Sequence, residues 1–320
     1  MTAVPPADMN YPPIRNGMDY LRSVVAHLDR GEPDERDLKY AVLHLQAATE
    51  VLLKALLVAF DWRQVFSKPD EADQLAYEHG DFTSCKIEDA IKRLRAQGVE
   101  ITPEGKGNIT HLAQQRNRLQ HFRLTSAAPA IEARAAQVLD FLIALVDDHL
   151  RPGLTGDDAQ HLEQEMRHVR EALPRIRSYS AIIMDRIAPE LAGRQWYTLR
   201  CPDCTKWALL AEGGEVRCLF CETDWDAEAF PLPYVVGVLG HSWRDYRKDP
   251  TGPAAQCPEC GAYALVGGAY VAARPEEAVQ YCFGCSEVFD GLEPCMRCGQ
   301  LYQPGPDHVA ICTDCLGSMG

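Results

Sequence analysis

Residues 201–221 read CPDCTKWALLAEGGEVRCLFC, and residues 257–285 read CPECGAYALVGGAYVAARPEEAVQYCFGC. Each stretch begins with a Cys-Pro-acid-Cys quartet and ends with a second Cys-x-x-Cys pair. The two residues inside a pair let both sulfurs converge on one metal ion, and two such pairs complete a tetrahedral four-thiolate site. The 13 and 21 residues between the pairs are long enough for a β-hairpin. The repeat therefore predicts two related zinc ribbons.

The twelve cysteines beyond residue 200 all fall into such pairs, and a third unit, residues 295–315, is more compact than the first two. The predicted ligands of three structural Zn²⁺ sites, in consecutive pairs, are Cys201 and Cys204 with Cys218 and Cys221, Cys257 and Cys260 with Cys282 and Cys285, and Cys295 and Cys298 with Cys312 and Cys315. The repeat favours this grouping over a cross-braced one. Four thiolates also suit an iron–sulfur cluster, but they leave no open position for a catalytic zinc.

The cysteine pattern also indicates the cellular compartment in which the protein works. A disulfide scaffold needs a secreted, oxidised chain, and Met1–Pro13 has neither the basic nor the apolar region of a signal peptide. No uninterrupted apolar stretch approaches the ~20 residues of a membrane-spanning helix. We therefore expect a cytoplasmic protein with metal-bound thiolates and no membrane partner. The lone Cys85 is expected to be a buried structural thiol.

Composition and charge separate the ribbons from the rest of the chain. The 320 residues are enough for about two domains, and 46% hydrophobic with 24% charged residues is typical of globular proteins. The net charge is −14, and residues 201–320, with 7 basic and 17 acidic side chains, hold −10 of it. Because this surface repels phosphate, we expect the ribbons to bind protein or to organise a dimer. A nucleic-acid contact would use the basic and aromatic stretch His241–Lys248.

The first half of the chain has helical periodicity and few strand signals. The predicted fold class is therefore α plus small β modules: an all-α bundle followed by a helical arm and zinc ribbons. The predicted divisions are 1–153 for the bundle, 154–193 for the arm, 194–230 for ribbon 1, 231–291 for a connector with ribbon 2, and 292–320 for ribbon 3. The predicted helices span 38–60, 87–97, 109–123 with Asn108 or Thr110 as the cap, 130–150, and 157–191 with a kink at Pro174. A short β run is expected at Tyr234–Val238.

A second motif lies inside the predicted bundle. Residues 111–123 read HLAQQRNRLQHFR, and within them Arg116 and Asn117 precede His121. Asn117 and His121 are i,i+4 neighbours on one helix face. Arg116 lies ~100° around the helix, yet its long side chain can reach the same patch. The Asn makes the pattern selective, because Arg22 and His27 repeat the spacing with Ser23 in its place.

The Arg-Asn-x-x-x-His pattern resembles the signature of HEPN-superfamily ribonucleases, and the helix around residues 45–57 is similar to an early helix of that family. The resemblance covers residues 14–150 and does not extend to the ribbons. It implies metal-independent RNA cleavage, in which the ribose 2′-hydroxyl attacks the adjacent phosphate and leaves a 2′,3′-cyclic phosphate. It also implies a homodimer in which two copies of the motif face each other.

The resemblance assigns a role to each residue of the motif. His121 is implied as the general acid or base, and Arg116 is implied to hold the scissile phosphate. Asn117 would orient His121 or bind the phosphate. Three basic side chains are predicted to guide the RNA backbone, namely Lys106, Arg118 and Arg123.

Two further expectations complete the sequence-based interpretation. Glu50 and Lys54, at i,i+4 spacing, are expected to form an ion pair that approaches the motif. A role in toxin or antiviral defence follows by analogy alone. The alternative function is a non-catalytic adaptor or RNA-binding protein, in which a helical dimerisation domain displays protein-binding ribbons.

Overall fold

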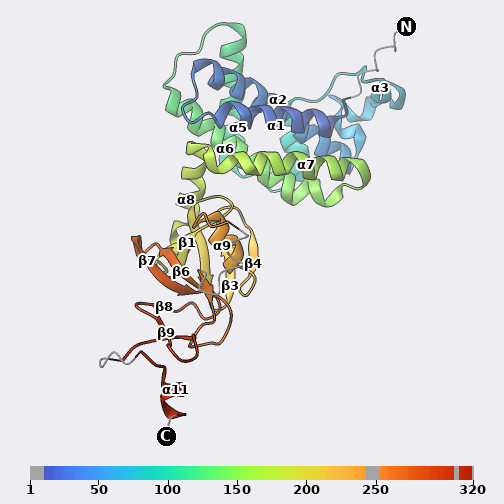
Figure 1. Ribbon diagram of the computed structural model, residues 1–320. Helices are drawn as coiled ribbons and strands as arrows, with labels where there is room; N and C mark the ends of the chain where they lie inside the picture. Colours follow the sequence, from blue (N-terminus) through green and yellow to red (C-terminus); the bar gives the residue numbers. More distant parts are fainter. Residues whose placement is uncertain (1–10, 243–252, 306–309, 319–320) are drawn as a thin grey trace, which may run out of the picture. The chain divides into compact units, whose positions relative to one another are not determined.

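The computed structural model describes residues 11–242, 253–305 and 310–318, and the chain forms two compact units, Met1–Ile182 and Ile183–Gly320 (Figure 1). The first unit is helical, whereas the second holds the β-strands and three four-cysteine clusters. This confirms the coarse prediction of a helical region followed by cysteine-rich β modules.

Helices α1 (Pro13–Leu28) and α2 (Glu35–Phe60) form the centre of the helical unit. A capping box starts α2, because the Asp34 side chain accepts a hydrogen bond from the Asp37 amide at 2.8 Å and the Asp37 carboxylate accepts from the Asp34 amide at 3.4 Å. The apolar face of α2 is fully buried at Leu45 and Leu52. The long central helix that the spacing predicts is therefore confirmed.

Helix α2 is also long and apolar enough, by length and composition, to cross a membrane. However, 61% of its most apolar window is buried, and α2 contacts α1, α4 (Ile87–Ala96), α5 (Pro103–His121) and α6 (Ala128–Leu145). These contacts identify α2 as the core helix of the bundle.

Helix α5 begins earlier than predicted. Its N-cap is Thr102, whose Oγ1 accepts a hydrogen bond from the Gly105 amide at 3.0 Å, and Pro103 occupies the first turn. Asn108, predicted as a cap, lies inside the helix and accepts a hydrogen bond from Arg134 at 2.7 Å. The prediction was wrong because glycines at 105 and 107 weaken the helical pattern there.

The segment beyond α6 is broken into several helices. A π-helical turn (Val146–Leu150) and a 3₁₀ turn (Arg151–Gly153) follow α6, and α7 (Gly156–Ala172) then packs against α1. The predicted helical segment over 157–191 is interrupted at Pro174, as expected, but the interruption is a full break, in which a 3₁₀ turn separates α7 from α8 (Arg177–Leu191). Proline lacks the amide hydrogen that would continue the helix.

Short elements join α2 to α4, namely 3₁₀ turns Trp62–Val65 and Pro69–Glu71 and helix α3 (Gln74–His79).

The two related ribbons share one eight-stranded sheet. Its order is β4-β3-β2-β1-β6-β7-β8, with β5 also paired to β6. The strands are β1 (Thr198–Arg200), β2 (Trp207–Glu212), β3 (Glu215–Cys218), β4 (Asp224–Asp226), β5 (Ala254–Ala255), β6 (Leu265–Val271), β7 (Arg274–Cys282) and β8 (Val288–Phe289). Leu199 of β1 pairs with Leu209 on one side and with Val271 on the other, which joins the two ribbons.

The segment after the first ribbon differs from its prediction. Tyr234–Val238 was expected as a β run, but residues Pro231–Gly237 form helix α9. The fully buried Tyr234 packs against Phe230 and Phe283 there, and this aromatic core overrides the strand propensity of the neighbouring valines. Of the stretch His241–Lys248, residues 243–248 lie outside the described residues.

The third cysteine unit is built from smaller elements. Strands β9 (Glu293–Pro294) and β10 (Leu301–Tyr302) pair antiparallel, and helix α11 (Thr313–Gly317) carries the last cysteine. With so little regular structure, we expect this unit to need a metal ion at its cysteine cluster for order.

Candidate metal centres and a polar groove in the helical unit

The twelve paired cysteines converge on three sites, as the repeat predicts. In each consecutive set of four, all sulfurs lie within 4.8 Å of one another. This confirms the predicted grouping of consecutive pairs.

The sulfur geometry tests whether a tetrahedral ion fits. Sulfurs of opposite pairs are separated by 3.6 Å between Cys204 and Cys218, 3.8 Å between Cys257 and Cys285, and 3.7 Å between Cys298 and Cys312. A Zn–S bond of ~2.3 Å gives a tetrahedral edge of ~3.8 Å, whereas a disulfide would need ~2.05 Å. The cysteines therefore suit a structural metal ion, with zinc as the predicted one.

Local backbone geometry prepares these pairs for ligation. In the first pair the Cys201 amide donates to Lys206 O at 2.9 Å, and the Thr205 amide donates to Cys201 O at 3.0 Å. The residue after the second cysteine has a positive φ, 63° at Thr205 and 74° at the equivalent Gly261. Glu222 and Ser286 repeat this conformation after the second pairs, with φ of 57° and 64°. Non-glycine residues accept this strained region where the surrounding structure enforces it.

The residues of the Arg-Asn-x-x-x-His motif lie at the C-terminal end of α5. A guanidinium nitrogen of Arg116 donates a hydrogen bond to Asn117 Oδ1 at 2.9 Å. Arg116 is half-buried, whereas Asn117 and His121 are exposed. The helix ends at His121, and the next side chain, Phe122, is 94% exposed.

Arg116 faces a groove formed with α1 and α2. The groove, of about 510 Å³, is lined by Arg116 together with Tyr20, His44, Glu50 and Lys54, among others. Within the described part of the chain, Asn117 and His121 are not among its lining residues. The structure therefore brings Arg116 to α2 and leaves His121 facing outward.

The predicted Glu50–Lys54 ion pair is present. Lys54 Nζ lies 2.5 Å from Glu50 Oε1 and also donates to Ser84 Oγ at 2.8 Å. Both side chains line the groove that Arg116 faces, and the Glu50 carboxylate offsets the charge of Lys54 there.

The three predicted RNA-guiding side chains, Lys106, Arg118 and Arg123, are all exposed. Lys106 lies in the first turns of α5 and Arg118 in the last, twelve residues or ~18 Å apart along the axis. The three cations therefore cannot all bind one phosphate.

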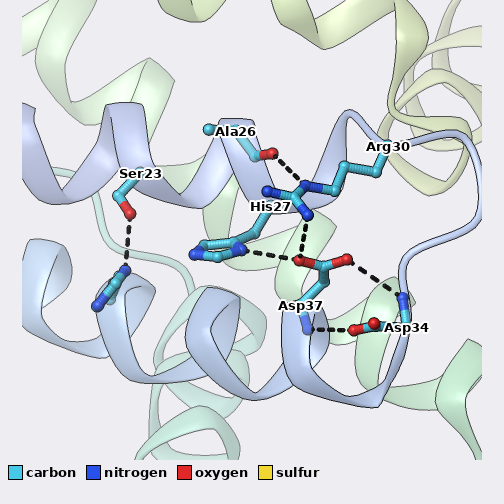
Figure 2. Close-up of polar contacts among 7 residues, drawn as sticks. Ser23, Ala26, His27, Arg30, Asp34 and Asp37 are labelled. Atoms are coloured by element: carbon cyan, nitrogen blue, oxygen red, sulfur yellow. Dashed lines mark hydrogen bonds and ion pairs between the residues drawn. The ribbon is translucent and has the colours of Figure 1, made fainter.

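Sequence reasoning missed a polar cluster between α1 and α2, which Figure 2 shows. Ser23 Oγ and His44 Nδ1 share a hydrogen bond of 2.8 Å, and His27 Nδ1 donates to Asp37 Oδ1 at 3.0 Å. Arg30 approaches the same Asp37 oxygen at 3.3 Å. The two imidazole ring centres are 5.9 Å apart, so the hairpin of α1 and α2 presents two anchored histidines side by side.

Electrostatics distinguish the members of this cluster. Burial, with a smaller contribution from His27, lowers the pKa of His44. The hydrogen bond from His27 lowers the pKa of Asp37, which keeps this carboxylate ionised. A sequence signal existed, because polar side chains recur at heptad spacing, at 16, 20, 23 and 27 on α1, at 30 just beyond it, and at 37, 40 and 44 on α2.

Cys85, on the edge of the bundle core, is 2% exposed, and burial raises the pKa of its thiol. Its location agrees with the expected buried structural thiol.

A comparison with protein-family models finds no match to this chain, and comparisons with curated proteins and with solved structures find none either.

Proposed function

We propose that the helical unit is a metal-independent endoribonuclease and that Arg116, Asn117 and His121 serve its active site. One observation carries the proposal. The guanidinium of Arg116 is held by Asn117 at 2.9 Å and faces a groove that also contains the Lys54–Glu50 ion pair. A planar, fixed guanidinium is the side chain best suited to a phosphodiester.

The proposed reaction needs proton transfer and charge stabilisation. The ribose 2′-oxygen attacks the adjacent phosphorus, the bond from phosphorus to the 5′-oxygen breaks, and the products are a 2′,3′-cyclic phosphate and a 5′-hydroxyl. His121 takes or gives the proton, which contributes ~10²–10⁴-fold in rate. Arg116 stabilises the negative charge that builds up on the phosphate oxygens.

We also propose that the active form is a homodimer. His121 is exposed at the end of α5 beside Phe122, which is 94% exposed. An exposed phenylalanine next to a polar motif suits an interface with a second copy of the chain. Phe122→Ser is expected to shift the molecular mass in solution from dimer to monomer, as measured by light scattering.

The test is RNA cleavage by the purified full chain in EDTA, with metal content measured in parallel. Wild type is expected to release 2′,3′-cyclic phosphate ends, and Arg116→Ala and His121→Gln to lose at least ~100-fold in rate. His168→Gln, on an exposed face of α7, is the matched control and retains the rate. If wild type cleaves none of several structured and unstructured RNAs, the proposal is wrong.

A second candidate function is a protein-binding adaptor, which the third cysteine unit favours. Met296 there is 83% exposed and Leu316 is 44% exposed, and large exposed apolar side chains suit a protein partner. Under this function, Met296→Ser with Leu316→Ser abolishes partner binding, whereas Arg116→Ala has no effect on it. Quantitative binding to a partner that co-purifies with the wild type measures the difference.

A further inference from the structure

The hollow beside the turn that joins α1 to α2 has the composition of an acid–base site. Its volume is about 450 Å³, and its lining residues are His27, Arg30, Asp34, Arg36, Asp37, Tyr40 and His44. His44 also lines the groove that Arg116 faces. One histidine therefore belongs to both hollows, and a chain-like ligand bound at Arg116 would meet it next.

The hydrogen bonds of the cluster define which ring atoms remain for a ligand. The ionised Asp37 carboxylate can only accept, so His27 Nδ1 carries a proton at their 3.0 Å contact. Figure 2 shows the second ring nitrogen of His27 pointing away from Asp37. The Nδ1 atom of His44 is likewise occupied by Ser23. In both rings Nε2 is thus the atom that can exchange a proton with a substrate.

The surroundings of the two rings differ. His27 Nδ1 is hydrogen-bonded to the Asp37 carboxylate at 3.0 Å, whereas His44 Nδ1 is hydrogen-bonded to the Ser23 hydroxyl. His44 has no carboxylate at its Nδ1, and burial lowers its pKa. Tyr40 packs against both rings, at 5.6 Å from His27 and 5.8 Å from His44 between ring centres, which fixes their separation.

We infer that His27 and His44 form a second acid–base pair, complete within one chain, that acts on a phosphodiester of single-stranded RNA. His44 accepts the proton of the ribose 2′-hydroxyl, the 2′-oxygen bonds to phosphorus, the bond to the 5′-oxygen breaks, and His27 donates a proton to that oxygen. Arg30 and Arg36 line the hollow and offer donors to the non-bridging oxygens. The inference rests on the proposed ribonuclease function, but it assigns the proton transfers to histidines outside the α5 motif.

The first experiment measures binding, independently of cleavage. The probe is a hexaribonucleotide that is 2′-O-methylated throughout, which leaves no hydroxyl to attack, titrated into the full chain while histidine ring ¹⁵N shifts are recorded. His27→Gln and His44→Gln identify the two signals. We expect both Nε2 signals to move on addition of the probe, with the His161 signal from α7 unchanged as the control. Unchanged His27 and His44 signals would overturn the inference.

The second experiment measures single-turnover cleavage of an unmodified RNA. His27→Gln and His44→Gln are each expected to lose at least ~100-fold in rate, with His161→Gln equal to wild type and thermal melting confirming the fold. Ser23→Ala, which releases His44 Nδ1, lowers the rate, and Ser23→Thr restores it, because only the hydroxyl positions the ring.

The outcomes separate this inference from the proposed function. If His121→Gln and Arg116→Ala abolish cleavage while His27→Gln and His44→Gln leave it intact, the inference is wrong and the α5 site stands. If only the His27 and His44 variants lose cleavage, the inference stands and the assignment of His121 is wrong. If wild type cleaves no RNA, the ribonuclease function and the acid–base role are both wrong.

Discussion

The unit Met1–Ile182 buries long helices against one another, whereas the strands of Ile183–Gly320 are only two to nine residues long. In the helical unit, Leu21, Leu45 and Leu52 are fully buried, and none of the twelve predicted metal ligands belongs to this unit. In the β unit, one four-cysteine cluster comes from the segments around β1–β4, a second from those around β5–β8, and a third from the β9–β10 segment. From this difference we expect the helical unit to fold without metal and the β unit to need metal at its cysteine clusters for full order.

Removing the metal should expose this difference most strongly. A structural zinc site contributes ~10–16 kcal/mol in small peptides, so a strong chelator is expected to unfold the β unit while leaving the helices intact. Far-ultraviolet circular dichroism at the helical minimum, with a thiol-reactive dye to count exposed cysteines, measures both. Loss of the helical signal together with thiol exposure would show that the two units share their stability.

A core substitution in α2 should destabilise the helical unit and leave the β unit folded. Leu52→Ala removes a fully buried side chain and is expected to cost ~2–5 kcal/mol of the free energy of unfolding of the helical unit. Leu75→Ala, where the side chain is 62% exposed, is the control and should change it by less than ~0.5 kcal/mol. Urea denaturation followed by circular dichroism gives both values, and an equal effect of the two variants would contradict the core assignment.

The repeat offers a sharper test inside the β unit, because equivalent positions hold different residues. Thr205 has φ 63° and Gly261 has φ 74°. Thr205→Gly is expected to stabilise the metal-loaded unit by ~1 kcal/mol, and Gly261→Thr to destabilise it by a similar amount. Thermal melting in the presence of zinc measures the two shifts, and shifts of the same sign would refute the argument from backbone strain.

The smallest expected effect is a pH dependence in the helical unit. The folded pKa of Asp37 lies below its ordinary value of 3.8, chiefly through the hydrogen bond from His27. The carboxylate therefore stabilises the fold above pH ~4, and this contribution disappears as the pH falls through the folded pKa. Asp37→Asn should be less stable than wild type at pH 7, and the difference should shrink as the pH falls below the ordinary carboxyl pKa of 3.8. A difference that stays constant as the pH falls would assign the effect to capping of α2 instead.

The metal clusters were predictable because the spacing of neighbouring cysteines determines their geometry. Two residues between cysteines bring their sulfurs to one ion, and the repeat of Cys201–Cys204 at Cys257–Cys260 fixes the grouping. Helix α2 was predictable for the same reason, since its apolar residues recur along one face. A local pattern also gave a wrong prediction at Tyr234, where a β run is predicted but a helix forms and Tyr234 packs against Phe283.

The polar cluster could not be predicted in this way, because it depends on tertiary packing. His27 and His44 lie on different helices, 17 positions apart in the sequence, and only the packing of α1 on α2 brings their rings to 5.9 Å. The pairing of Leu199 with Val271 is also non-local. The heptad spacing of polar residues marks a polar face on each helix, but it does not show that the two faces meet, and no short stretch of residues predicts the Leu199–Val271 pairing.

The double pairing of β1 has a consequence for how the β unit can change over evolutionary time. Deleting residues 198–226 to leave the second ribbon alone would strip β6 of the backbone that now covers its edge at Val271. An uncovered strand edge recruits other chains and promotes aggregation. The two related ribbons are therefore hard to separate, because a strand of the first covers an edge of the second.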